Sequence, residues 1–189
     1  MKTLISILFF TLSFQPLISF ADAEGDIWEK LKNGGLVVLI RHTHTSVKDT
    51  KPLLRDPSCV KERNLSEAGK KEAARIGNMF ATKGVLVSKV LTSPYCRTAD
   101  TANIAFGSSQ PVEFLTVLEA LPQKLAEANT EQLTQKIGSY SGSGNLILVT
   151  HAPNISAVSF ENVEMGAFLV LQPMGGGEFE EIGIINLAL

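Results

Sequence analysis

The chain lacks a surplus of charge of either sign and has few cysteines and histidines. Its 17 basic residues nearly balance its 19 acidic residues, so its charge gives no general reason to bind nucleic acid or an anionic membrane. Its 2 cysteines are poor zinc ligands because no histidine run accompanies them. Internal repeats and low-complexity linkers are also lacking. We therefore expect one globular domain whose partner is a small molecule.

The first residues carry the pattern of an export signal. Lys2 precedes an almost wholly apolar run over residues 4–20, and the small-residue sequence Ala-Asp-Ala follows. This order is typical of a cleaved signal peptide. An uncleaved membrane anchor is the alternative, but a proline interrupts the run and no basic flank follows it. The sequence predicts a signal peptide over residues 1–23 and a periplasmic or secreted mature domain over residues 24–189, with no membrane contact after cleavage.

Continuous apolar runs alternate with segments of helical periodicity. Residues 36–40 and 145–150 are unbroken apolar runs, which are typical of strands buried on both faces of a largely parallel sheet. Residues 67–82 instead carry apolar side chains at helical spacing, so we expect an α/β fold of layered strands and helices. The expected strands are residues 36–40, 85–91, 145–150, 168–171 and 178–186, and the expected helices are residues 26–32, 67–82, 96–106 and 124–139.

Four residues suited to phosphate chemistry lie near the ends of predicted strands. Arg41 and His42 directly follow the first strand, Arg97 comes shortly after the second, and His151 directly follows the third. Because ligands of open α/β sheets bind beyond the carboxyl ends of the strands, we expect these side chains to converge. Arginine matches two phosphate oxygens at once. The sequence therefore predicts a phosphate pocket.

The expected reaction uses one histidine as a covalent nucleophile. A neutral imidazole nitrogen of His42 can attack phosphorus. A protonated His151 can then stabilise the transition state together with Arg41 and Arg97. The backbone N–H of Ala152 can also reach the phosphate, because a short helix is expected to begin just after it.

A metal site is the competing interpretation of the same histidines. His42 and His44 are two residues apart, and His151 could be a third ligand. Against this interpretation, the arginines beside His42 and His151 would repel a divalent cation. We therefore expect no metal.

Four ordered motifs resemble those of a known enzyme family. Residues 39–43 (Leu-Ile-Arg-His-Thr), 64–69 (Asn-Leu-Ser-Glu-Ala-Gly), 92–102 (Thr-Ser-Pro-Tyr-Cys-Arg-Thr-Ala-Asp-Thr-Ala) and 149–151 (Val-Thr-His) are similar to motifs of the histidine phosphatase, or phosphoglycerate mutase-like, superfamily. The resemblance implies three layers, with helices on both faces of a mainly parallel sheet, and acid-type phosphatase chemistry without metal or cofactor. Thr43 departs from the family pattern, where glycine is usual, and is expected to narrow the loop beside the nucleophile.

The resemblance assigns roles that agree with the direct interpretation of the residues. His42 matches the phosphorylated nucleophile, Arg41 and Arg97 match the phosphate clamp, and His151 matches the second pocket histidine. Glu119 lies where the family places its general acid, but the aromatic and glycine residues that often follow that acid are missing. It could equally be a solvated carboxylate. His44 and Asp49 are reserve donors.

Hydrolysis is favoured over mutase activity, because mutases of this family carry insertions for which the chain has little room. Exported relatives include phosphatases of lipopolysaccharide-core heptose, and compact relatives include phosphohistidine phosphatases that act on proteins. Export favours a cell-envelope sugar phosphate as substrate. The alternatives are a protein phosphohistidine phosphatase and an inactive anion-binding module of the same fold.

The two cysteines are expected to lie in an oxidising compartment after export. Cys59 lies in the polar loop before residue 64, and Cys96 is adjacent to Arg97. Export favours a disulfide between them, whereas two unlinked buried cysteines are the alternative. A bridge would tie the loop to the phosphate pocket.

Overall fold

A six-stranded sheet forms the centre of the protein in the computed structural model, which describes residues 20–46 and 53–187. The strand order is β3-β2-β4-β1-β5-β6. The first four strands in this order are parallel to one another. Strand β5 is antiparallel to β1, and the edge strand β6 is antiparallel to β5. The strands are β1 (Val37–Arg41), β2 (Val87–Thr92), β3 (Gln110–Pro111), β4 (Asn145–Thr150), β5 (Phe168–Gly175) and β6 (Glu178–Ile185).

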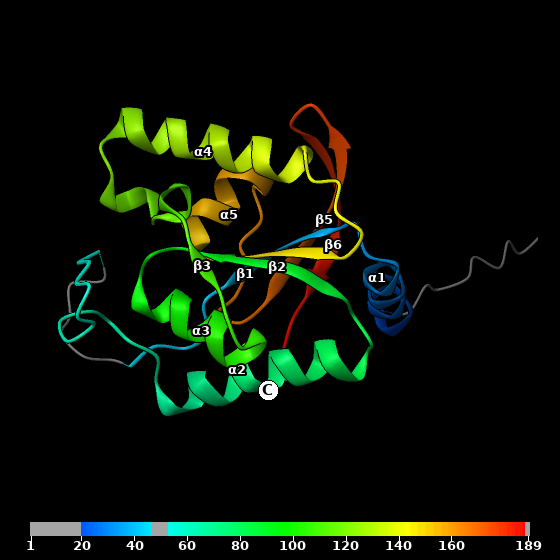
Figure 1. The fold of residues 1–189 in the computed structure, drawn as a ribbon, viewed down its shortest axis with the longest axis horizontal. Coiled ribbons are helices and arrows are strands. Elements are labelled where there is room, and N and C mark those ends of the chain that lie inside the picture. Colours follow the sequence, from blue (N-terminus) through cyan, green and yellow to red (C-terminus); the bar gives the residue numbers. More distant parts are fainter. Residues whose placement is uncertain (1–19, 47–52, 188–189) are drawn as a thin grey trace, which may run out of the picture.

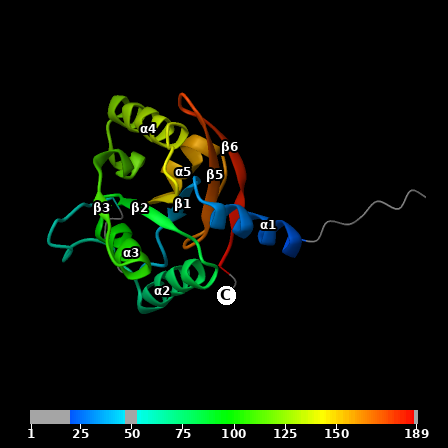
Figure 2. The same cartoon turned by 45° about the vertical axis from the view of Figure 1, so that its right-hand side comes forward.

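Helices cover both faces of this sheet. Figures 1 and 2 show α2 and α3 below the sheet, α4 and α5 above it, and α1 at the end remote from the loops that follow β1. The expected layered, mainly parallel α/β fold is therefore confirmed. The helices are α1 (Phe20–Asn33), α2 (Glu67–Thr82), α3 (Cys96–Phe106), α4 (Gln123–Gly138) and α5 (Ala152–Ser159), with short 3-10 turns η1 (Glu113–Leu115) and η2 (Leu118–Ala120).

Strand β1 shows why the central strands are apolar at every position. Val38 and Ile40 belong to the core cluster that includes α1, α2 and α3. Val37 and Leu39 belong to the cluster that includes α4 and α5. Since successive side chains of a strand point to opposite faces, both sets must be apolar when helices cover both faces.

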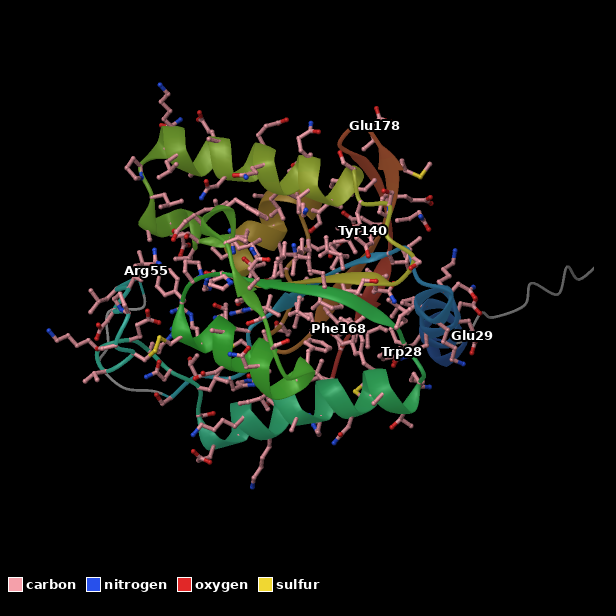
Figure 3. All side chains as sticks on the ribbon, viewed as in Figure 1. Trp28, Glu29, Arg55, Tyr140, Phe168 and Glu178 are labelled. Atoms are coloured by element: carbon pink, nitrogen blue, oxygen red, sulfur yellow. A yellow bond between two sulfur atoms is a disulfide. The ribbon has the colours of Figure 1, made fainter. Side chains whose placement is uncertain are left out.

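A cluster of aromatic rings packs α1 against the face of the sheet that α2 and α3 cover. The Trp28 ring meets Phe80 and Phe168 edge-on, with centroid distances of 5.6 and 5.8 Å. Figure 3 shows Trp28 and Phe168 pointing into the layer between the helices and the sheet. Such edge-to-face pairs add stability beyond the area they bury.

Two strand boundaries differ from the prediction by two residues or more because tertiary contacts decide them. Residue Val85 was expected to begin a strand, but its N–H donates to the Phe80 carbonyl and closes the end of α2. Strand β5 was expected to end at residue 171, but pairing with β6 carries it on to Gly175. Residues 113–121, which have no clear sequence pattern, form the two 3-10 turns.

The predicted signal peptide lies largely outside the described residues. Helix α1 begins at Phe20, earlier than the expected residue 26. Cleavage after residue 23 and export stay predictions. No helix among residues 20–46 and 53–187 is long and apolar enough to span a bilayer.

Candidate active site

The predicted phosphate residues meet at the carboxyl ends of the parallel strands. A pocket of about 370 Å³ opens there, between the segments that follow β1, β2 and β4. This is the place where open α/β sheets bind ligands. The pocket is lined by Arg41, His42, Leu53, Arg63, Arg97, Val117, Glu119, His151, Ala152 and Pro153.

His42 is buried and held in one tautomer. Its Nδ1 lies 2.9 Å from the Thr43 carbonyl oxygen, and because a carbonyl can only accept, Nδ1 carries the proton and Nε2 keeps its lone pair. Burial is the largest cause that lowers the pKa of His42 to about 3, and Arg97 and Arg41 lower it further. The imidazole is therefore neutral at physiological pH, as a nucleophile requires.

His151 lies beside His42, with their ring centroids 5.5 Å apart. Arg97 Nη2 lies 3.3 Å from its Nδ1, and since a guanidinium can only donate, Nδ1 accepts and Nε2–H donates to Ser93 Oγ at 2.8 Å. Burial, followed by Arg97 and His42, holds the pKa of His151 well below its ordinary value. Burial beside arginines thus disfavours a positive charge on His151, and its protonation in the transition state stays a prediction.

Two arginines that line the pocket have buried hydrogen-bond donors without a partner. The Arg97 guanidinium is buried and lies over the Tyr95 ring, 4.4 Å from its centroid. Arg41 Nη1 donates to the Val163 carbonyl at 2.9 Å. Among the described residues, Arg97 Nε and Nη1 and Arg41 Nε have no hydrogen-bond partner. Buried donors without a partner are costly, so these groups are suited to an anion that supplies the missing oxygens.

A third pocket arginine, Arg63, was missed by sequence reasoning. It lines the pocket, and its buried Nε also lacks a partner among the described residues. Its charge contributes to the lowered pKa values of His42, His151 and Arg97. The available signal was its place directly before the motif at residues 64–69.

His44 does not join the other two histidines. It is absent from the pocket lining, and its Nδ1 lies 2.8 Å from Glu72 Oε2. No group of three or more His, Cys, Asp or Glu side chains suited to a metal occurs in the described ranges. The structure thus does not assemble the alternative ligand set of His42, His44 and His151.

The motif around Ser66 explains how the loop after β1 is held. Ser66 Oγ accepts from the Gly69 N–H at 3.0 Å, which caps α2. The same hydroxyl donates to the His44 carbonyl at 3.2 Å. A Cβ at position 69 would collide with that carbonyl oxygen, so glycine permits the close approach of helix and loop.

Thr43 is accommodated outside the lining of the phosphate pocket. It is fully buried, is absent from the pocket lining, and its N–H donates to Thr101 Oγ1 at 3.2 Å. The Thr43 side chain therefore forms no part of the pocket wall, and the expected narrowing of the loop stays a prediction.

The remaining candidates lie at the mouth of the pocket. Glu119, in η2, lines the pocket but is exposed, which suits both a general acid and a solvated carboxylate. Ala152 is the first residue of α5 and lines the pocket, so the N-terminal end of this helix faces the site, two residues earlier than expected. The reserve donor Asp49 lies outside the described residues.

The two cysteines form a disulfide. Cys59 and Cys96 are joined with a Cα–Cα distance of 5.8 Å and a sequence separation of 37. For a closed loop of this length, the chain-entropy model gives a stabilisation of about 4 kcal/mol.

Comparisons with known proteins find similarity to one family. The model of the histidine phosphatase superfamily (branch 1) matches residues 37–121. Solved structures that share the fold include the following three. The protein histidine phosphatase SixA in complex with tungstate is 16% identical, with a TM-score of 0.58 over 79% of this chain and 96% of that chain. Mycobacterial glucosyl-3-phosphoglycerate phosphatase Rv2419c is 14% identical, with a TM-score of 0.58 over 77% and 96%. YhfR of Bacillus stearothermophilus is 16% identical, with a TM-score of 0.57 over 77% and 94%.

Sequence identities as low as these show a shared fold and nothing more. A search of curated proteins finds no match. The family model covers the first arginine–histidine pair, the capped helix and the second arginine, and the structure adds His151 beside them. Motifs, fold and pocket geometry agree with the family match: residues 37–121 are similar to branch 1 of the histidine phosphatase superfamily, and the described residues have the fold of its solved structures.

Proposed function

We propose that this protein is a metal-independent phosphomonoester hydrolase that forms a phosphohistidine intermediate on His42. The observation that carries the proposal is the set of unpartnered guanidinium N–H groups of Arg41, Arg63 and Arg97 around a neutral histidine. A phosphate supplies several oxygens at once and carries the opposite charge. A phosphate can accept from these donors while the nucleophilic nitrogen attacks its phosphorus.

The reaction proceeds in two displacements. His42 Nε2 forms a bond to phosphorus while the bond from phosphorus to the leaving oxygen breaks, and Glu119 gives its proton to that oxygen. Water then attacks phosphorus, the P–N bond breaks with its electron pair returning to Nε2, and Glu119 takes up the proton of the water. The arginines stabilise the charge on the transferring group in both steps.

The size of the pocket supports a small phosphorylated substrate. Its volume of about 370 Å³ leaves room for a phosphate and a leaving group of monosaccharide size. With the predicted export, this favours a cell-envelope sugar phosphate over a cytoplasmic phosphoprotein. Turnover of sugar phosphates and of a phosphohistidine peptide under the same conditions separates the two substrate classes.

Rapid-quench trapping of the intermediate tests the proposal. Protein mixed with labelled p-nitrophenyl phosphate is expected to retain an acid-labile, base-stable label. His42→Ala should abolish the label. His44→Gln is the matched control, because His44 lies outside the pocket lining, and it should label like wild type. Full labelling of His42→Ala would remove the phosphohistidine mechanism, and wild-type protein that binds phosphate without turnover would instead indicate an anion-binding module.

A further inference from the structure

The loop of residues 53–64 brings Arg63 to the pocket although it has almost no core of its own. Of its residues only Glu62 is buried, and apolar side chains such as Leu53 and Val60 are exposed, by 39% and 82%. A segment with so little buried apolar surface gains little from the hydrophobic effect. Specific ties to the rest of the protein must therefore hold it in place.

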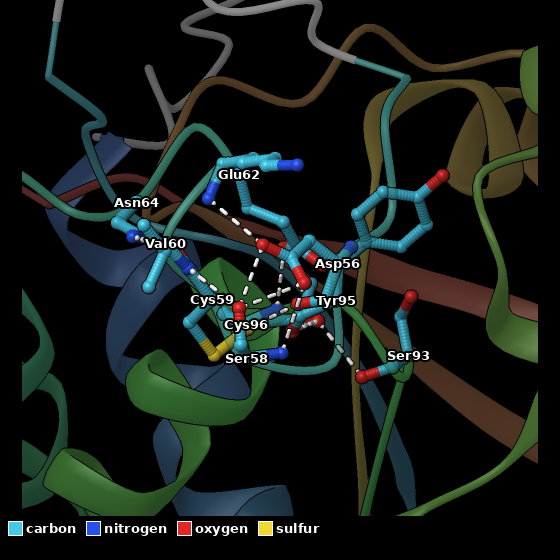
Figure 4. The surroundings of a disulfide bond; sticks show 11 residues. Asp56, Ser58, Cys59, Val60, Glu62, Asn64, Ser93, Tyr95 and Cys96 are labelled. Atoms are coloured by element: carbon cyan, nitrogen blue, oxygen red, sulfur yellow. Dashed lines mark hydrogen bonds between the residues drawn. A yellow bond between two sulfur atoms is a disulfide. The ribbon is translucent and has the colours of Figure 1, made fainter.

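The first tie is the disulfide between Cys59 and Cys96. Figure 4 shows the bond joining the 53–64 loop to the first turn of α3. Helix α3 is itself held by buried residues, among them Thr101 and Ala102. The bond therefore fixes the loop to an element whose position does not depend on the loop.

The second tie is the carboxylate of Glu62. Its Oε2 accepts from the Cys96 N–H at 2.8 Å, and its Oε1 accepts from the Asp56 N–H at 3.0 Å. One buried side chain thus joins the N-terminal end of α3 to the far side of the loop. The Tyr95 hydroxyl adds a third tie by donating to the Leu53 carbonyl at 2.8 Å.

All three ties end on Tyr95 and Cys96, next to Arg97. Arg63 follows Glu62 directly, so any movement of Glu62 moves the third arginine of the pocket. Arg41 and Arg97 differ in this respect, because they belong to β1 and α3. Loss of the ties should therefore affect the contribution of Arg63 and leave the other two arginines in place.

We infer that the Cys59–Cys96 disulfide and Glu62 are positioning groups, which hold Arg63 toward the phosphate and make phosphate affinity depend on the oxidised state of the cysteines. The inference rests on the phosphate pocket of the proposed function. A dithiol opens the bond by two thiol–disulfide exchanges: the S–S bond breaks, Cys59 and Cys96 become thiols, and the dithiol, having given two electrons and two protons, closes to its own disulfide.

A double-mutant cycle on phosphate affinity tests this coupling. Calorimetric titration with inorganic phosphate is applied to wild type, Arg63→Ala, Cys59→Ser/Cys96→Ser and the combined variant, each checked for folding by its thermal melt. We expect Arg63→Ala to weaken binding by about tenfold or more, as loss of a charge-assisted contact does. The cysteine variant is expected to be weakened several-fold, and the combined variant no further than Arg63→Ala. Losses that multiply, or a folded cysteine variant that binds like wild type, would overturn the inference.

Two further measurements keep the result independent of folding defects. Wild type treated with a dithiol under native conditions is expected to lose affinity to the same extent as the cysteine variant. Glu62→Gln is expected to weaken phosphate binding. Glu62 accepts from two backbone N–H groups, and the side-chain amide of glutamine would place its own N–H group opposite one of them. Glu67→Gln is the matched control, since Glu67 is exposed and pairs with Lys70.

The two proposals fail in different ways. Wild type that binds phosphate without hydrolysing an ester would refute the hydrolase and leave the coupling measurable. Oxidised wild type that binds no phosphate would refute both. Wild type that binds and hydrolyses, together with a Glu62→Gln variant indistinguishable from Glu67→Gln, would refute the positioning role alone.

Discussion

Mild acid should destabilise this protein through the two buried histidines of the pocket. Burial and the neighbouring arginines lower the pKa of His42 to about 3 and hold the pKa of His151 well below 6.5. In the unfolded chain both residues titrate near 6.5. As pH falls through 6.5, the unfolded chain takes up protons that the folded pocket does not accept, so the free energy of unfolding decreases.

The magnitude follows from the difference in proton uptake. For His42, whose unfolded pKa is near 6.5 and whose folded pKa is about 3, the free energy of unfolding falls by about 2 kcal/mol between pH 7 and pH 5. The lowered pKa of His151 acts in the same direction and adds to this loss. For His42 the loss continues until the pH reaches its folded pKa of about 3.

Urea unfolding with the disulfide intact measures this loss. Unfolding curves at pH 7, 6 and 5 give the free energy of unfolding for wild type and for the double variant His42→Gln/His151→Gln. The variant should lose less than wild type over this range, by at least the roughly 2 kcal/mol that His42 contributes. If both proteins lose the same amount, the pocket histidines are not the cause and the assignment of their neutral state is wrong.

The other predictions concern the pocket chemistry. Arg97→Lys should lower kcat/KM by about 10²–10³, because lysine cannot supply a two-pronged contact; near-wild-type activity would show that Arg97 does not contact the transferring group. Glu119→Gln should lower turnover of an alkyl phosphate by about 10²–10⁴ and of p-nitrophenyl phosphate far less, since only the alkoxide needs a proton; small, equal losses would remove Glu119 from the mechanism. Activity should persist in EDTA and be inhibited by vanadate, whereas loss in EDTA with rescue by zinc would favour a metal site.

Local patterns in the sequence were enough to find the first part of the site. Arg41, His42 and His151 follow strands whose apolar runs are unbroken, and such runs are the signature of central parallel strands. Helices α2 and α3 were predicted at the same bounds as observed, because apolar periodicity, the Ser66 cap and a glycine after each helix are all encoded locally.

Arg63 shows what local patterns could not supply. It lies in a polar loop without periodicity, and it reaches the pocket because a disulfide and a buried glutamate tie that loop to α3. These ties join residues that are more than thirty positions apart in the chain. The end of β5 and the start of β2 were likewise decided by pairing and by the closing turn of α2.

The charge state of the site also depends on tertiary structure. The sequence determined which side chains could bind and attack a phosphate, since that follows from the chemistry of arginine and histidine. It could not determine that both histidines are neutral, because a pKa depends on burial and on every nearby charge. For His42 and His151 those charges come from Arg41, Arg63 and Arg97, which only the folded chain brings within reach of the same two rings.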